Sequence, residues 1–324
     1  MVVATLAIAS PGVVILAPEA QAAATNSNSA TAQSPYPVVY SLAAVGTNPI
    51  TNPGASPAGA NNWSCRPSAT HPDPVVLVHG LGATMAENWA TISPLLVDNG
   101  YCVFALTYGL NPGEQYVGGL QAMELSSQQL ASFVDRVLAS TGASKVDLVG
   151  HSEGTVMPQY YLKFLDGAAR VNRYVAIAPL YQGTTLAGLN ALLDAMETYF
   201  PSVASPLETA VANECGSCQE FLHGSSFLRH LYADGIYAAP GVTYTTIMTR
   251  YDELVTPYTS GQLNAPNATN IVVQNQCMFD FSEHLTLAFD PVAAQDVLNA
   301  LDPNDAQKVP CTLVLPGIGA PAFP

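Results

Sequence analysis

The chain has 324 residues, of which 24 are acidic and 9 are basic, giving a formal net charge of −15. Nucleic-acid binding is excluded, because affinity for a phosphate backbone needs clustered Lys and Arg side chains. With 49% hydrophobic and 10% charged residues, the composition also excludes a disordered chain and allows a large core. Division of the length by about 150 residues per domain suggests two domains, although one α/β domain can also be this long.

The first 22 residues have the features of a signal peptide. An apolar run at residues 2–17 is followed by Ala20-Gln21-Ala22, a small-residue cleavage site. The run is too short for a membrane-spanning helix, which needs about 20 apolar residues. A signal peptide begins with a positively charged region, but no Lys or Arg lies near Met1. A truncated or misassigned start would account for this absence. The alternative to a signal peptide is a buried N-terminal helix. We expect a secreted, extracellular protein without a transmembrane anchor.

A leader with an extended backbone is expected at residues 23–62, which are rich in Ala, Ser, Asn, Thr, Pro and Gly. From residue 63 to 324 we expect one catalytic domain, in which compact apolar strands alternate with amphipathic helices. Near-continuous apolar strands indicate a parallel sheet covered on both faces. The expected strands are residues 75–78, 102–106, 146–149, 174–177, 244–248 and 270–273. The expected helices are residues 85–98, 124–141, 154–166 and 291–301.

Residues 180–240 interrupt the alternation and are expected to form a helical cap or lid.

Six cysteines fit an exported chain, because an even count in an oxidising compartment favours disulfides. Six cysteines allow 15 pairings. The favoured pairs are Cys65–Cys102, Cys215–Cys218 and Cys277–Cys311. The short Cys-x-x-Cys spacing could also suggest a zinc or redox site, but no second such pair follows and no thioredoxin-like unit surrounds it. No metal and no cofactor are expected.

A candidate nucleophile lies at residues 150–154, Gly-His-Ser-Glu-Gly, between the strand at 146–149 and a helical stretch. This strand-turn-helix context is what a nucleophile elbow needs, because the two glycines let the backbone turn sharply. Ser152 would then project its hydroxyl beside the positive N-terminus of the helix. An ordinary turn serine is the alternative.

A serine is a poor nucleophile unless a base takes its proton. In folds with a nucleophile elbow, the partners of the serine follow it in the order Ser, acid, His. His284 is the histidine that follows the late strands, in a loop before the last helix, although a surface histidine there is the alternative. The acid should follow the preceding strand, where Asp252 is favoured and Glu253 and Asp280 compete with it. The other histidines lie before the domain, after the first strand, inside the elbow or in the insertion: His71, His79, His151, His223 and His230.

Acyl transfer also needs hydrogen-bond donors for the oxyanion of the tetrahedral intermediate. The loop His-Gly-Leu-Gly at residues 79–82 follows the first strong strand, and its glycines let backbone amides turn toward Ser152. We expect the backbone N–H groups of Leu81 and Glu153 to form the oxyanion hole. A plain β-turn is the alternative for this loop.

From about Trp63 to Cys311 the chain resembles the secreted triacylglycerol lipases of the α/β-hydrolase fold found in high-GC Gram-positive bacteria. The resemblance is carried by Val-Val-Leu-Val-His-Gly-Leu at 75–81, by residues 146–155 around the elbow, by Ala-Pro-Leu-Tyr-Gln-Gly-Thr-Thr at 178–185 and by Gly-Ser-Ser-Phe-Leu at 224–228. It implies ester hydrolysis through an acyl-serine, with the roles carried onto Ser152, Asp252 and His284. Local pairing of cysteines is similar too.

The expected function is therefore that of a triacylglycerol lipase or carboxylesterase. An acyltransferase and a polyester or cutin esterase use the same three residues and remain alternatives; a non-catalytic scaffold that binds hydrophobic ligands is a third. The expected partners are an acylglycerol or other ester and a lipid–water interface, with no nucleic acid, and the chain is expected to be a monomer.

Overall fold

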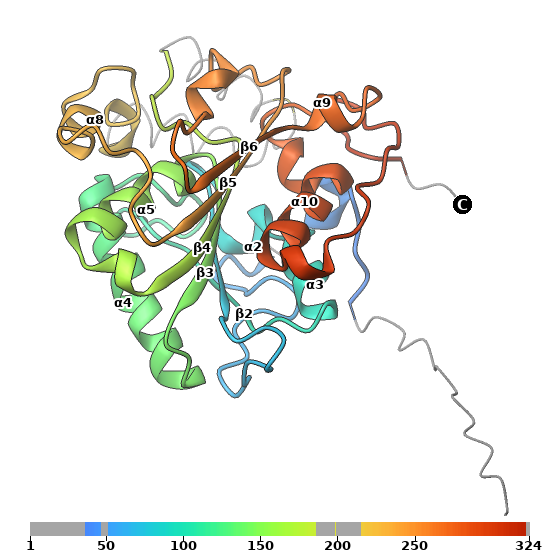
Figure 1. Cartoon of the computed structure of the whole chain (residues 1–324), viewed down its shortest axis with the longest axis horizontal. Coiled ribbons are helices and arrows are strands. Elements are labelled where there is room, and N and C mark those ends of the chain that lie inside the picture. Colours follow the sequence, from blue (N-terminus) through green and yellow to red (C-terminus); the bar gives the residue numbers. More distant parts are fainter. Residues whose placement is uncertain (1–35, 47–50, 186–197, 199–214, 322–324) are drawn as a thin grey trace, which may run out of the picture. The chain divides into compact units, whose positions relative to one another are not determined.

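The computed structural model describes residues 36–46, 51–185, 198 and 215–321 of the chain (Figure 1). The expected signal peptide and the first part of the expected leader lie outside the described residues, as does most of the central stretch of the expected cap. In the part of the chain that is described, no helix is both long and apolar enough to span a membrane.

The described domain is built on one sheet of six parallel strands, in the order β2-β1-β3-β4-β5-β6. The prediction of a parallel sheet is confirmed, and each of the six expected strands overlaps an observed one. Their bounds are Val75–Val78 (β1), Val103–Leu106 (β2), Val146–His151 (β3), Val171–Ile177 (β4), Thr243–Met248 (β5) and Ala268–Val272 (β6).

Helices cover both faces of this sheet, with α4 and α5 on one face and α3 and α10 on the other (Figure 1). The bounds of the α-helices are Met85–Asn88 (α2), Ile92–Asp98 (α3), Met123–Thr141 (α4), Glu153–Phe164 (α5), Ser226–Leu231 (α8), Val273–Gln276 (α9) and Pro291–Leu301 (α10). The short 3₁₀ helices are Leu42–Val45 (η1), Gly167–Ala169 (η2), Ser217–Gln219 (η3), Tyr258–Gly261 (η4), Thr286–Phe289 (η5) and Pro303–Asp305 (η6).

The strands are apolar throughout because each one feeds two cores. In β1, Val76 and Val78 pack toward α4 and α5, whereas Val75 and Leu77 pack toward α3 and α10. All four side chains are fully buried. Successive side chains of a strand point to opposite faces, so a sheet covered on both sides needs an unbroken apolar run.

One expected helix, residues 85–98, is divided in the structure. It forms α2 and α3, separated by residues 89–91. Pro94 is the third residue of α3, and a proline fits the first turn of a helix, where its missing N–H would have no intrahelical partner. The proline therefore marks a new helix start, and a single continuous helix was the wrong prediction here.

The ends of the longer helices follow from local chemistry. Asp290 caps α10 by accepting hydrogen bonds from the amides of Val292 (2.6 Å) and Ala293 (3.0 Å), and Pro291 occupies the first turn. The C-terminus of α4 is capped by Gly142, which follows the last helical residue. Its φ of 77° is a left-handed conformation that glycine adopts without steric cost.

Three disulfides join the domain, and they link the pairs that the sequence favours. Cys65–Cys102 and Cys277–Cys311 close loops with sequence separations of 37 and 34, whereas Cys215–Cys218 closes a separation of only 3. No free cysteine remains. The Cys-x-x-Cys pair is therefore oxidised in this structure and lies at η3, in the described part of the expected cap.

Candidate active site

The candidate nucleophile lies in a strained turn between β3 and α5. Ser152 has φ of 54° and ψ of −122°, a region that non-glycine residues rarely occupy. A Cβ atom on Gly150 would lie 1.9 Å from the carbonyl oxygen of Gly154, and one on Gly154 would lie 2.1 Å from the carbonyl oxygen of Val78. Gly150 is therefore required for the turn to close, and Gly154 for the turn to pack against β1. The turn presents the Ser152 hydroxyl.

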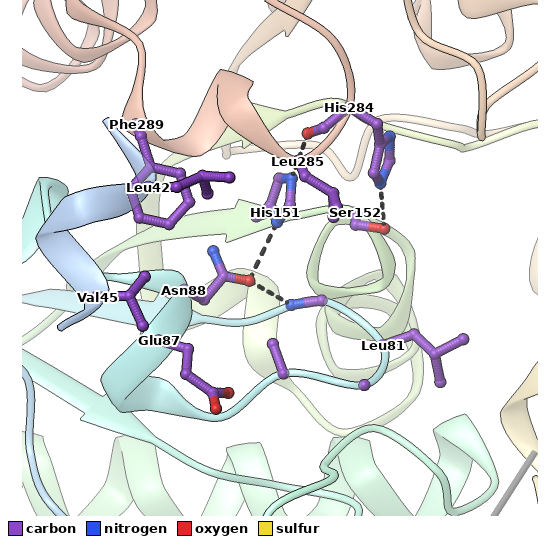
Figure 2. A pocket seen from close by; sticks show the side chains of 13 residues that line it. Leu42, Val45, Leu81, Glu87, Asn88, His151, Ser152, His284, Leu285 and Phe289 are labelled. Atoms are coloured by element: carbon purple, nitrogen blue, oxygen red, sulfur yellow. Dashed lines mark hydrogen bonds between the residues drawn. The ribbon is translucent and has the colours of Figure 1, made fainter. Parts of the chain in front are cut away.

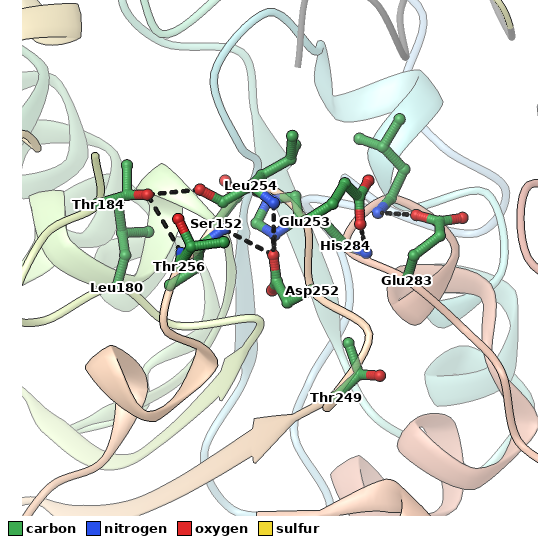
Figure 3. Close-up of polar contacts among 12 residues, drawn as sticks. Ser152, Leu180, Thr184, Thr249, Asp252, Glu253, Leu254, Thr256, Glu283 and His284 are labelled. Atoms are coloured by element: carbon green, nitrogen blue, oxygen red, sulfur yellow. Dashed lines mark hydrogen bonds and ion pairs between the residues drawn. The ribbon is translucent and has the colours of Figure 1, made fainter. Parts of the chain in front are cut away.

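The structure brings Ser152, His284 and Asp252 together (Figure 3). His284 Nε2 lies 2.8 Å from Ser152 Oγ, and its Nδ1 lies 2.9 and 3.0 Å from the two carboxylate oxygens of Asp252. The amides of Leu254 and Val255 donate hydrogen bonds to Asp252 Oδ1 at 3.0 and 2.7 Å. The acid is thus held by its own turn while it orients the imidazole, which is the arrangement of a Ser-His-Asp relay.

The two acids that compete with Asp252 in the sequence occupy different places. Glu253 Oε2 accepts a long hydrogen bond, 3.4 Å, from the backbone amide of His284 and makes no hydrogen bond to the His284 ring. Asp280 is buried and accepts from Ser282 N at 2.9 Å and Ser282 Oγ at 2.6 Å, so it braces the loop before His284. Of the three carboxylates, Asp252 alone is within hydrogen-bond distance of the His284 ring in the described part of the chain.

The basicity of His284 is set by opposing effects. Burial lowers its pKa, but the charges of Asp252, Glu253 and Glu283 together outweigh the burial and leave the pKa above the ordinary value of 6.5. Only 2% of His284 is exposed. A buried base with a raised pKa takes a proton from a serine hydroxyl more readily than an ordinary histidine does.

Two backbone amides near Ser152 are the expected donors of an oxyanion hole. The amides of Leu81 and Glu153 have no hydrogen-bond acceptor among the described residues. Gly80 lets their two segments approach closely, because a Cβ atom on it would lie 2.9 Å from Ser152 Cβ. The loop is fixed from behind, where Gly82 N donates to Gly118 O at 2.9 Å and Gly118 N donates to Ala83 O at 3.1 Å. Two free, preorganised N–H groups are what an oxyanion hole requires.

Two residues that the sequence analysis did not assign to the site connect its parts. His151 Nδ1 lies 3.0 Å from Asn88 Oδ1, and His151 Nε2 lies 3.0 Å from the carbonyl oxygen of His284. Asn88 Oδ1 also accepts a 2.9 Å hydrogen bond from Gly80 N. Burial lowers the pKa of His151 to about 3. A neutral His151 has a single ring N–H and donates to only one of these two oxygens. His151 and Asn88 lie between the loop at residues 79–82, the nucleophile elbow and the loop that carries His284, and Asn88 Oδ1 holds the first of these loops through Gly80 N (Figure 2).

The side chain of Glu153 is a buried acid that lies behind the loop at residues 79–82. It is 1% exposed, and burial raises its pKa well above the ordinary value. Its polar neighbours are the hydroxyls of Tyr108 and Ser217, but these donate to carbonyl oxygens of His79 (2.7 Å) and Gly119 (2.5 Å). Neither hydroxyl hydrogen is left for the carboxyl group, whose two oxygens have no hydrogen-bond partner among the described residues, and burial therefore favours the neutral form of Glu153.

A cavity opens beside the Ser152 hydroxyl, with mainly apolar walls (Figure 2). It lies between the loop at residues 79–82, which we call the oxyanion loop, the loop that carries His284 and Leu285, which we call the histidine loop, and the short helix η1. Its lining consists of Leu42, Val45, Gly80, Leu81, Gly82, Ala83, Glu87, Asn88, His151, Ser152, His284, Leu285 and Phe289.

Comparison with known proteins agrees with this geometry. Residues 72–297 match the family model described as lipase (class 2). The chain belongs to this lipase family. The prediction of an α/β-hydrolase lipase is therefore confirmed at the level of the family, and the matched residues include all three members of the Ser152, Asp252 and His284 cluster.

Individual lipases are similar to the chain over part of their length. Lipase B of Pseudozyma antarctica is 26% identical over 272 residues, which cover 78% of this chain and 66% of that protein. A triacylglycerol lipase of Burkholderia plantarii is 34% identical over 92 residues, which cover 27% of this chain and 24% of that protein. The chain thus matches about two thirds or less of the length of these relatives.

A solved structure confirms the predicted α/β-hydrolase fold. The crystal structure of lipase B of Aspergillus fumigatus superposes with a TM-score of 0.55 at 19% sequence identity. The superposition covers 79% of this chain and 56% of that chain. In such open α/β sheets, ligands bind at the carboxyl ends of the strands, which is where Ser152, Asp252 and His284 lie.

Proposed function

We propose that this class 2 lipase hydrolyses carboxylic esters, with triacylglycerols as its substrate class, through an acyl-serine intermediate. One observation carries the proposal. His284 Nε2 is 2.8 Å from Ser152 Oγ while its Nδ1 is 2.9 Å from Asp252, beside two amides that have no acceptor among the described residues. These are the parts that acyl transfer from an ester needs.

In the first half of the reaction, Ser152 Oγ attacks the ester carbonyl carbon as His284 Nε2 takes the hydroxyl proton. The carbonyl oxygen becomes an oxyanion and accepts hydrogen bonds from the amides of Leu81 and Glu153. Asp252 holds the imidazole in the required tautomer and stabilises the imidazolium. His284 then gives its proton to the leaving alkoxide, so that the C–O bond breaks and the alcohol departs.

In the second half, water replaces the alcohol. His284 removes a proton from the water as it attacks the acyl-serine carbonyl, and the same amides hold the second oxyanion. Collapse of this intermediate returns the proton to Ser152 Oγ and releases the carboxylic acid. The raised pKa of Glu153 favours both halves, since an ionised carboxylate behind the loop at residues 79–82 would repel the developing negative charge.

Triacylglycerols are proposed as the substrate class on two grounds. The cavity beside Ser152 is mainly apolar, as the chains of an acylglycerol require, and two relatives carry the name triacylglycerol lipase. We also propose secretion, which the three disulfides support, because such bonds persist in oxidising compartments.

The test is hydrolysis of emulsified tributyrin and triolein, followed by titration of the released acid, next to a soluble short-chain ester. We expect release of acid from the emulsions and a loss of at least about a thousandfold in the Ser152→Ala variant. Hydrolysis of the soluble ester alone would reduce the function to that of an esterase. Parent-like hydrolysis by Ser152→Ala would remove the proposed mechanism altogether.

A further inference from the structure

The N-terminal segment of the described domain contributes to the cavity beside Ser152. Leu42 and Val45, from η1, face the cavity from the side opposite to Ser152 (Figure 2). The two residues are three positions apart, and side chains at this spacing eclipse each other in a 3₁₀ helix. Both therefore point from η1 in the same direction, and together they form one continuous apolar surface.

Backbone hydrogen bonds hold η1 in this place. Leu42 N donates to Ile318 O at 3.1 Å, and Ala320 N donates to Tyr40 O at 2.8 Å. On the other side, Thr91 Oγ1 donates to Val39 O at 2.7 Å. Because the anchors are backbone groups of the segment, the side chains of η1 can be exchanged without removing any of them.

The loop that carries His284 adds to the lining beside η1. Leu285 directly follows His284, and Phe289 ends η5, which packs against η1, and both residues line the same cavity (Figure 2). Glu87 is the acidic residue in the cavity lining. Its Oε2 already accepts hydrogen bonds from Thr84 N at 2.9 Å and from Thr84 Oγ1 at 3.1 Å. A group that extends from Ser152 into the cavity thus meets apolar side chains of η1 and of the loop that carries His284.

We propose that Leu42 and Val45 form a selectivity wall for the apolar chain of the ester that reacts at Ser152. This inference rests on the proposed function and adds a specificity determinant to it. An ester carbonyl held at Ser152 has an acyl chain on one side and an alcohol on the other, and both are apolar in an acylglycerol. When the acyl or alcohol chain of the ester enters this cavity, kcat/KM for that ester rises about fourfold for each methylene that is buried against the wall.

The experiment compares the purified full chain with two variants in two series of soluble esters. One series lengthens the acyl chain of p-nitrophenyl esters, and the other lengthens the alcohol of butyrate esters. Leu42→Trp fills the cavity and Leu42→Ala enlarges it. Val39→Ala is the matched control, because Val39 lies in the same segment with 40% of its surface exposed and its anchoring carbonyl is retained.

The readout is the ratio of kcat/KM for the longest ester to that for the shortest one. We expect this ratio to fall about tenfold in Leu42→Trp and to rise in Leu42→Ala in one of the two series, and to stay unchanged in Val39→Ala. The responding series identifies the chain that the cavity holds. A folding defect lowers all rates together and cannot move the ratio in opposite directions. Unchanged ratios in both series would overturn the proposed role of Leu42 and Val45 in chain selectivity. A parent protein that hydrolyses no ester would instead overturn the proposed function.

Discussion

Asp252 presents both carboxylate oxygens to His284 Nδ1, at 3.0 and 2.9 Å, whereas its sequence neighbour Glu253 reaches only the backbone amide of His284. The two acids are adjacent in the chain, yet the turn after β5 separates their roles. Asp252 orients the ring, and Glu253 contributes charge to its surroundings. This division can be tested directly because both side chains have isosteric amides.

The first prediction concerns that division. Asp252→Asn is expected to lower kcat about a thousandfold to ten-thousandfold, because an amide cannot stabilise the imidazolium and favours the wrong tautomer. Glu253→Gln, the matched control one residue along, should stay within about tenfold of the parent. Steady-state kinetics on a soluble ester gives both numbers. Equal losses in the two variants would argue against Asp252 as the acid of the relay.

The second prediction is the pH dependence of kcat/KM. Only neutral His284 can accept the serine proton, so the rate falls as the pH drops through the pKa of His284. Since that pKa is raised above 6.5, the acid limb should have its midpoint above this value. Removing the nearby charge in Glu253→Gln should move the limb to lower pH. A midpoint below 6.5 in the parent would contradict the assigned electrostatics.

The third prediction concerns the raised pKa of the buried Glu153 carboxyl group. Its pKa is raised in the folded chain, so its contribution to stability is present below its ordinary pKa and is lost as the pH rises through the folded pKa. The Tm of Glu153→Gln relative to the parent should therefore increase between about pH 4.5 and about pH 8. Glu114→Gln, the same change in a surface loop, reports the effect of the amide itself. A relative Tm that stays constant or falls over this range would mean that the pKa of Glu153 is not raised in the folded chain.

The fourth prediction separates the disulfides by the loops that they close. In the chain-entropy description, loss of a bridge costs more for a longer loop. Replacing both Cys65 and Cys102 by Ala should lower the free energy of unfolding by about 4 kcal/mol, and replacing Cys215 and Cys218 by about 1.5 kcal/mol. Urea unfolding followed by circular dichroism measures both. A larger loss at the Cys215–Cys218 pair would show that this short bridge organises more than its own loop.

Much of the fold could be predicted because local patterns and tertiary packing agree. The six apolar runs became strands since a sheet covered on both faces buries every side chain in them, as Val75 and Val76 show in β1. The nucleophile turn could be located because steric demand leaves a visible trace. Gly150 and Gly154 are needed where a Cβ atom would meet a backbone carbonyl.

The residues that the sequence did not reveal act through distant contacts. Asn88 lies in a short helix and gives no signal of its own, but it bonds to Gly80 and contacts His151, which is 63 positions away. Leu42 reaches the cavity because its segment bonds to Ile318 at the other end of the chain. No periodicity encodes such a pairing, so both roles become visible only in three dimensions.

The most direct test of the central claim is covalent labelling of the parent protein with a fluorophosphonate ester, which reacts with activated serines. Intact mass, peptide mapping and residual ester hydrolysis are followed in the same samples. We predict a single adduct on the peptide that contains Ser152, with hydrolysis lost in proportion to labelling, and no adduct in Ser152→Ala. Fully labelled protein that hydrolyses esters at the parent rate, or an adduct that persists in Ser152→Ala, would contradict the account.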